Sequence, residues 1–146
     1  MNISGTVSTI LNQKGHQTFS ISPDATVFEA IQLMAEKNVG ALLVTSDGKL
    51  VGLVSERDYT RKVALKGKSS RETKVSEIIS SPIISATPDH SLEECMRLMT
   101  HNRVRHLPVL VGDRLVGIVS IGDLVNWTIS AQDAAIEQLK SYIAGL

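Results

Sequence analysis

Apolar and polar residues follow a pattern along this chain that occurs twice. In each copy a short extended stretch, over residues 19–22 and 83–86, ends close to a proline. Next comes Thr26-x-x-Glu29 in the first copy and Ser91-x-x-Glu94 in the second, and both motifs predict a helix start closed by a capping box. Apolar residues then recur at the spacing of a buried helix face. These residues are Val27, Ala30, Ile31 and Met34 in the first copy, and Leu92, Cys95, Met96 and Met99 in the second.

Each predicted helix is followed by a β-rich pair of segments. In the first copy residues 41–45 and 50–55 are joined through Asp47-Gly48, and the second copy has Gly112-Asp113 at the matching place. Both dipeptides are typical of tight β-hairpins. A further helix is predicted after Ser55 and after Ser120. Each copy therefore has the predicted order β-α-β-β-α.

The two copies also match residue by residue. A shift of 65 positions places residues 18–59 on residues 83–124 with 15 identities in 42 positions. The match extends backwards after a slip of three residues, because 7–11 (VSTIL) resembles 75–79 (VSEII). An internal repeat of this kind sets the architecture of a chain.

The expected fold class is α/β (α+β), with two β-α-β-β-α repeats packed about a pseudo-two-fold axis. The first repeat, with the N-terminal segment, is expected over residues 1–65, and a polar linker over 66–74. The second repeat is expected over residues 75–128, and a C-terminal helix over 129–146. That helix carries an apolar stripe that needs a partner, either the body of the chain or a second subunit. The stripe consists of Ala135, Ile136, Leu139, Tyr142 and Ile143.

Composition narrows the class of protein. The chain has 146 residues, 42% of them hydrophobic, with 15 basic and 15 acidic residues. A neutral chain is not suited to coating nucleic acid or an anionic membrane. The longest apolar stretches run about five residues, whereas a membrane span needs about 20, and no signal peptide is visible. We therefore expect a soluble, cytoplasmic protein without nucleic-acid or membrane partners.

The motifs of the two copies resemble a tandem pair of CBS domains, over about residues 5–128. The first copy carries SPDATVFEAIQLM, GALLV and DGKLVGLVSERD, and the second carries RHLPV and DRLVGIVSIGD. The resemblance implies a regulatory binding module that associates as a homodimer. It also implies an adenosine-containing ligand held between the repeats. AMP is the first candidate, and ADP, ATP, NAD(H) and S-adenosylmethionine are the others.

The ligand motif of that family is Gly-h-h-Ser-x-x-Asp, where h is apolar, and it occurs as 52–58 and 117–123. A helix start attracts phosphate, and a carboxylate one turn later can accept hydrogen bonds from both ribose hydroxyls. Ser55, Asp58, Ser120 and Asp123 are therefore candidate ligand residues. The same Ser-x-x-Asp spacing also serves as an ordinary helix cap, so both interpretations stay open. Gly52 and Gly117 are expected to keep side chains out of the cleft.

A phosphate also needs cations. The resemblance places Arg105 and His106 near the ligand's phosphates, although both could equally be solvated or structural. Arg103 and Arg105 are expected on one face of a strand, with Arg103 at the surface. Arg57 could reach a phosphate or lie on a helix surface. The resemblance adds further residues to the candidate ligand set, and these are Ile84, Thr87 and Pro108.

The remaining reactive residues offer little chemistry. Cys95 lies on the apolar stripe and is expected to be a core thiol, with a redox sensor as the alternative. The four histidines lack the spacing of a metal site, and nothing supplies a nucleophile or an acid/base pair, so we expect no enzyme and no metal. The leading hypothesis is an adenine-nucleotide sensor. The alternative is a ligand-free interaction module that regulates an unidentified protein partner.

Overall fold

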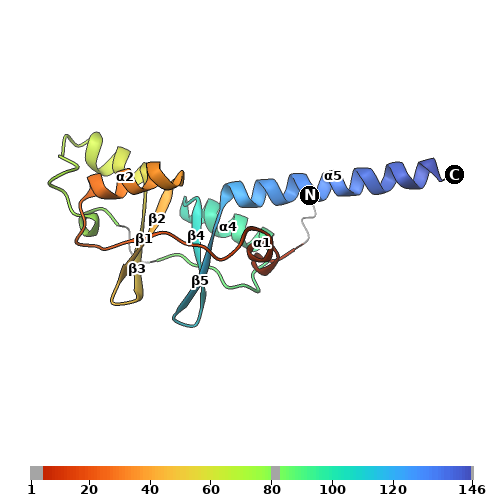
Figure 1. Ribbon diagram of the computed structural model, residues 1–146, viewed down its shortest axis with the longest axis horizontal. Coiled ribbons are helices and arrows are strands. Elements are labelled where there is room, and N and C mark those ends of the chain that lie inside the picture. Colours follow the sequence, from red (N-terminus) through yellow and green to blue (C-terminus); the bar gives the residue numbers. More distant parts are fainter. Residues whose placement is uncertain (1–4, 80–82, 146) are drawn as a thin grey trace. The chain divides into compact units, whose positions relative to one another are not determined.

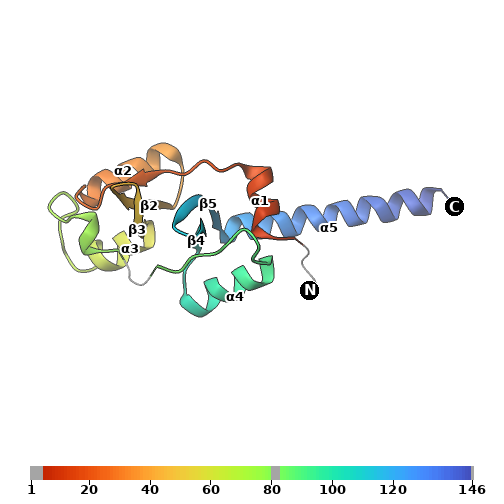
Figure 2. The same ribbon diagram turned by 90° about the horizontal axis from the view of Figure 1, so that it is seen from below.

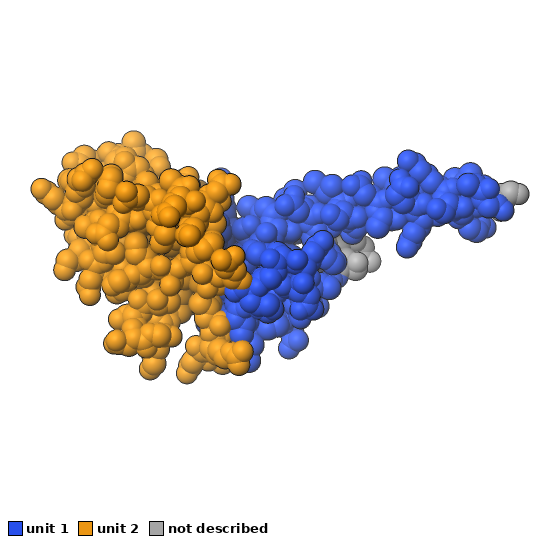
Figure 3. All heavy atoms as spheres, viewed as in Figure 1, with its two compact units in different colours: residues 1–16, 86–111, 116–146 blue, residues 17–85, 112–115 orange. Residues whose placement is uncertain are grey.

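The computed structural model describes residues 5–79 and 83–145, and it divides into two compact units (Figure 3). One unit, which we call unit 1, comprises residues 1–16, 86–111 and 116–146, of which 1–4 and 146 lie outside the described residues. The other, unit 2, comprises residues 17–85 and 112–115, again without the undescribed 80–82. The elements are labelled in Figure 1.

Unit 2 contains the first repeat in the predicted order. Strand β1 (Ser20–Ile21) is followed by α2 (Val27–Lys37) and by the hairpin of β2 (Ala41–Ser46) and β3 (Lys49–Ser55). The strand order is β1-β2-β3, with β1 parallel and β3 antiparallel to β2. At the turn Asp47 and Gly48 have φ values of 52° and 77°, as a type I′ hairpin requires. The predicted hairpin is therefore confirmed.

The first repeat continues beyond its hairpin in short helical pieces. Helix α3 (Glu56–Tyr59) passes directly into a π-helix (Thr60–Ala64), and a 3-10 turn (Val75–Glu77) follows later. Val63, Val75 and Ile78 from these pieces join the core that α2 forms with the sheet. Residues 75–78 therefore pack against the hydrophobic core of the first repeat.

Unit 1 contains most of the second repeat, without the turn residues 112–115. Helix α4 (Leu92–Asn102) precedes the hairpin of β4 (His106–Val111) and β5 (Arg114–Ser120). The extended stretch predicted over 83–86 shortens to an isolated parallel bridge between Ala86 and Val109. Ala86 still donates to the Pro108 carbonyl and accepts from the Leu110 N–H. The second repeat therefore keeps the pairing of β1 with β2, reduced to one residue.

The N-terminal segment belongs structurally with the second repeat. Helix α1 (Val7–Lys14) lies in unit 1, and the backbone N–H groups of Val7 and Ser8 donate to the carbonyls of His90 and Pro88. Residues 75–79, which match 7–11 in sequence, lie instead in unit 2. The sequence prediction grouped the N-terminal segment with the first repeat. In the structure, residues 7–14 thus lie in the unit of the second repeat, and residues 75–79 lie in the unit of the first. Each repeat is completed by the segment that precedes the other repeat in the sequence.

Gly52 and Gly117 lie beneath side chains of these two segments. A Cβ on Gly117 would lie 2.8 Å from Leu11 Cδ2, and a Cβ on Gly52 would lie 2.9 Å from Ile79 Cδ1. Leu11 and Ile79 are matched residues of the slipped repeat. The two glycines therefore leave room for an apolar side chain against the sheet, whereas we expected from the sequence that they would keep side chains out of a ligand cleft.

The end of α4 corrects one sequence prediction. Arg103 is the C-cap of α4, with φ 55° and ψ 41° in the left-handed region, as its counterpart Asn38 is for α2. Strand β4 begins only at His106. Arg103 and Arg105 therefore do not share a strand face. The prediction was wrong because the helix runs up to Asn102 and leaves no room for a strand there.

The C-terminal part of the chain is one helix. Helix α5 (Ile121–Ala144) runs for 24 residues through the predicted boundary between residues 128 and 129. Leu124 is fully buried, while every described residue from Ile129 to Gly145 is exposed. In Figures 1 and 2 this second half of α5 extends beyond α1 and α4.

Candidate functional site

In unit 2 the Ser55-x-x-Asp58 motif closes the start of α3. The Ser55 hydroxyl oxygen accepts from the Asp58 N–H at 3.2 Å, and Asp58 Oδ2 accepts from the Ser55 N–H at 3.0 Å. The Ser55 hydroxyl also lies 3.0 Å from Asp58 Oδ2 as a donor. The capping interpretation of this motif is therefore confirmed.

The second oxygen of this carboxylate is also occupied. Lys62 Nζ lies 3.1 Å from Asp58 Oδ1 and donates to the Ile78 carbonyl at 2.8 Å. An Asp–Lys pair four residues apart is the spacing at which side chains on a helix meet. Lys62 thus links the ligand motif to the segment 75–79 that covers the sheet.

In unit 1 the Ser120-x-x-Asp123 motif has the same geometry. Asp123 Oδ2 accepts from the Ser120 N–H at 2.8 Å, and the Ser120 hydroxyl accepts from the Asp123 N–H at 3.2 Å. These bonds cap α5. Asp123 Oδ1 accepts no hydrogen bond within residues 5–79 and 83–145, so one oxygen of this carboxylate is available to a further donor.

Asp123 is paired with a lysine from the far end of the sequence. Lys14 Nζ lies 2.7 Å from Asp123 Oδ2 and donates to the Ile118 carbonyl at 2.9 Å. Lys14 is the last residue of α1, so the ion pair joins two residues that are 109 positions apart in the sequence. The side chains of Lys14 and Asp123 are 32% and 22% exposed, which leaves the pair accessible to water and to a solute.

Arg105 and His106 lie at the same end of the unit. The Arg105 carbonyl accepts from the Ile121 N–H at 2.9 Å, which ties the start of β4 to the start of α5. Burial lowers the pKa of His106, the Asp123 carboxylate opposes this, and Lys14 and Arg105 add to the lowering. The structure therefore brings Ser120, Asp123, Arg105 and His106 together with Lys14 in one cluster, which we call the Asp123 cluster.

The other four predicted ligand residues are distributed over both units. Thr87 is exposed and its N–H donates to His90 Nδ1 at 2.8 Å. Pro108 is buried within β4. Ile84 and Arg57 are half-buried residues of unit 2. A ligand role for these four residues stays a prediction.

Two site residues were missed by the sequence analysis. Lys62 had a readable signal, its spacing of four from Asp58 on a predicted helix. Lys14 had none, because only the packing of α1 in unit 1 brings it to Asp123. Both lysines hold the ligand-motif carboxylates as ion pairs.

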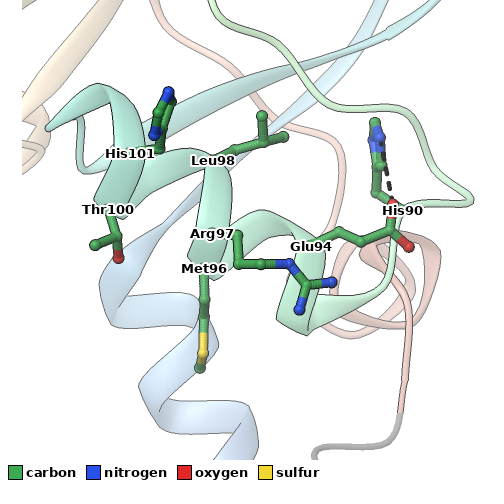
Figure 4. Close-up of a pocket in the computed structure, with 7 residues that line it drawn as sticks. All are labelled: His90, Glu94, Met96, Arg97, Leu98, Thr100 and His101. Atoms are coloured by element: carbon green, nitrogen blue, oxygen red, sulfur yellow. Dashed lines mark ion pairs between the residues drawn. The ribbon is translucent and has the colours of Figure 1, made fainter.

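A separate groove of about 720 Å³ lies on the outer face of α4 (Figure 4). It is lined by His90, Glu94, Met96, Arg97, Leu98, Thr100 and His101. His90 Nε2 and Glu94 Oε2 lie 3.7 Å apart at one end. The groove contains none of the predicted ligand residues, and a single helix with its preceding turn supplies all of the lining residues.

Cys95 is a core thiol. Its side chain is 0% exposed, and burial raises its pKa to about 11, with a smaller contribution from Glu94. A thiol of this kind is not a nucleophile near neutral pH.

Within the described residues there is no cluster of three metal-ligating side chains. No helix among those residues is long and apolar enough to cross a membrane.

We expect Cys95 to resist thiol reagents in the folded protein, because reaction requires exposure and the thiolate form. Ellman's reagent at mildly alkaline pH should label the native protein slowly and the urea-unfolded protein at once. Labelling of native protein as fast as unfolded protein would restore the redox-sensor alternative.

The tandem arrangement agrees with known proteins. The family model "CBS domain" matches residues 15–65 and again 75–130. The chain belongs to the CBS-domain family. The mitochondrial CBS domain-containing protein CBSX3 of Arabidopsis thaliana is 37% identical over 151 residues, which cover 97% of this chain and 73% of that protein.

Solved structures show the same relationship. A CBS-domain protein of Burkholderia ambifaria has a TM-score of 0.85 and 46% identity, over 88% of this chain and 96% of that chain. The hexameric CBS-CP12 protein of bloom-forming cyanobacteria has a TM-score of 0.76 and 26% identity, over 99% and 90%. The chain is thus a CBS pair, a regulatory module with a helical C-terminal extension.

Proposed function

We propose that this CBS pair is a non-enzymatic sensor of adenine nucleotides, with AMP as the first candidate ligand and ADP, ATP or NAD(H) as the others. The observation that carries the proposal is the Asp123 cluster. It combines a carboxylate whose Oδ1 accepts no hydrogen bond within the described residues with the Lys14 ammonium group, and Arg105 and His106 lie at the same end of the unit. A ribose needs the carboxylate as acceptor, and a phosphate needs cations nearby.

The two ligand motifs are expected to differ in affinity. Asp58 has hydrogen bonds or an ion pair on both oxygens, whereas Asp123 Oδ1 accepts no hydrogen bond from the part of the chain that the structure describes. The first repeat also has Gly40 and Ala41 where the second has Arg105 and His106. Asp123 is therefore the stronger candidate for the ribose contact. Separately, we propose that the protein is located in the cytoplasm.

A thermal-unfolding panel tests this proposal. AMP, ADP, ATP, NAD, NADH and S-adenosylmethionine would be compared for the wild type, Asp123→Ala and the hairpin-turn control Asp113→Ala. A ligand at 100 times its dissociation constant adds about 2.7 kcal/mol to the free energy of unfolding. We expect one ligand to raise the midpoint in the wild type and in Asp113→Ala but not in Asp123→Ala.

Because Asp123→Ala also removes a helix cap, its ligand binding should be measured by calorimetry well below its own midpoint. Binding of the same ligand with unchanged affinity would remove Asp123 from the site. The absence of heat and of any midpoint shift with all six compounds would overturn the nucleotide proposal.

One observation favours a second function, a ligand-free interaction module. Both motif carboxylates already cap helices and pair with lysines, and no buried side-chain nitrogen or oxygen of the described residues lacks a partner. Under this alternative, replacing Asp58 and Asp123 together would leave binding to a protein partner unchanged.

A further inference from the structure

Helix α5 leaves the body of unit 1 after its first two turns. Leu124 is fully buried and Trp127 and Thr128 are half-buried, so one face of the helix packs on the unit there. From Ile129 onward every described residue of the helix is exposed. More than four turns of helix therefore consist of exposed residues, although helices depend on tertiary packing for most of their stability.

The exposed part is not uniformly polar. Val125, Ile129, Ile136, Leu139 and Ile143 are each between 47% and 59% exposed. Together with Gln132 they are spaced by steps of four, three, four, three and four residues. This alternation is the heptad pattern of a coiled coil, in which positions a and d form one continuous seam. We call these six residues the α5 seam.

The residue types on the seam indicate the number of strands. Isoleucine occupies all three a positions, Ile129, Ile136 and Ile143, while the d positions are Val125, Gln132 and Leu139. A β-branched residue at a followed by leucine at d, as at Ile136 and Leu139, favours two parallel strands. The seam extends over about 27 Å at 1.5 Å per residue.

The flanking charges agree with a second copy as the partner. Among the positions beside the seam, 126, 128, 133, 135, 140 and 142, only Asp133 and Lys140 are charged. In a parallel pair these positions face Thr128 and Ala135 of the other copy, so no like charges meet. In an antiparallel pair with full overlap, Asp133 would face Asp133 of the other copy, which is unfavourable.

We propose that α5 binds α5 of a second copy of this chain as a parallel two-stranded coiled coil along the α5 seam. This pairing does not depend on nucleotide binding at Asp123. It covers the apolar residues that the isolated chain leaves exposed, which on a soluble protein mark an interaction site.

Molar mass from size-exclusion chromatography with light scattering tests the pairing. Ile136→Glu places a charge on the seam, whereas Ala134→Glu adds the same charge on the opposite side of the helix as a control. We expect Ile136→Glu to halve the mass of the wild-type assembly at micromolar concentration, and Ala134→Glu to leave it unchanged. Circular dichroism checks that the rest of both variants stays folded.

The orientation is tested with Ile136→Cys. In a parallel pair the two introduced thiols face each other at an a position, so mild oxidation should give a covalent dimer, while the buried Cys95 of the wild type should not. A mass unchanged by Ile136→Glu, or a wild type that is monomeric at high micromolar concentration, would overturn the pairing. Capture of a different protein on the seam of a monomeric chain would do the same. Failure of the cross-link would overturn the parallel arrangement.

Discussion

Replacing Leu11 by alanine is expected to lower the free energy of unfolding by about 2–5 kcal/mol, the range for a buried leucine truncated to alanine. Leu11 is 1% exposed and lies directly over Gly117, whose added Cβ would approach Leu11 Cδ2 to 2.8 Å and Cδ1 to 3.1 Å. The substitution removes the side chain that holds the N-terminal helix against the second hairpin. Urea denaturation followed by circular dichroism measures the loss.

The matched variant Gly117→Ala is expected to cost about 1–3 kcal/mol, because the new methyl group overpacks the same contact. In the double variant the methyl group occupies part of the space that Leu11 leaves. The double variant should therefore lose less stability than the sum of the two single losses. A strictly additive result would mean that Leu11 and Gly117 do not share this contact in solution.

Acidification below about pH 6.5 is expected to destabilise the protein through His106. Its folded-state pKa lies below the ordinary value of 6.5, first because the half-buried ring is partly removed from water. The unfolded chain therefore takes up a proton at a pH where the folded chain does not. Stability from this group is present above pH 6.5 and is lost as the pH falls through the folded pKa, with a slope of at most about 1.4 kcal/mol per pH unit.

Chemical denaturation across pH 5 to 8 tests this assignment, because that interval contains the ordinary histidine pKa of about 6.5. The wild type is compared with His106→Gln and with the exposed control His101→Gln. We expect the slope below pH 6.5 to become shallower only in His106→Gln. An unchanged slope in that variant would assign the acid sensitivity to other groups.

Local features of the fold were predictable because their energetics are local. The Ser91 and Glu94 box closes α4 as expected, and Thr26 accepts from the Glu29 N–H at the start of α2. Asp47-Gly48 adopts the two positive φ values of its turn. Each of these features depends on residues within four positions of one another, so the sequence contains all of the interacting groups.

The candidate site was predictable only in part. The recurrence of Gly-h-h-Ser-x-x-Asp pointed to Ser120 and Asp123, and both residues have the expected position at a helix start. The prediction that Arg103 lies in a strand was wrong, because Arg103 is the left-handed C-cap of α4. Its conformation depends on where α4 ends. Lys14 was missed because no spacing rule connects it with Asp123.

The sequence by itself determined the repeat, its β-α-β-β-α order, the capping residues and the family, since these depend on periodicity and on contacts within a few residues. Only the tertiary structure decided that α1 completes the second repeat, that Leu11 and Ile79 need the glycines beneath them, and that Lys14 neutralises Asp123. The physical reason is that these contacts depend on which apolar surfaces exclude water together, and that choice is made between segments up to 109 residues apart.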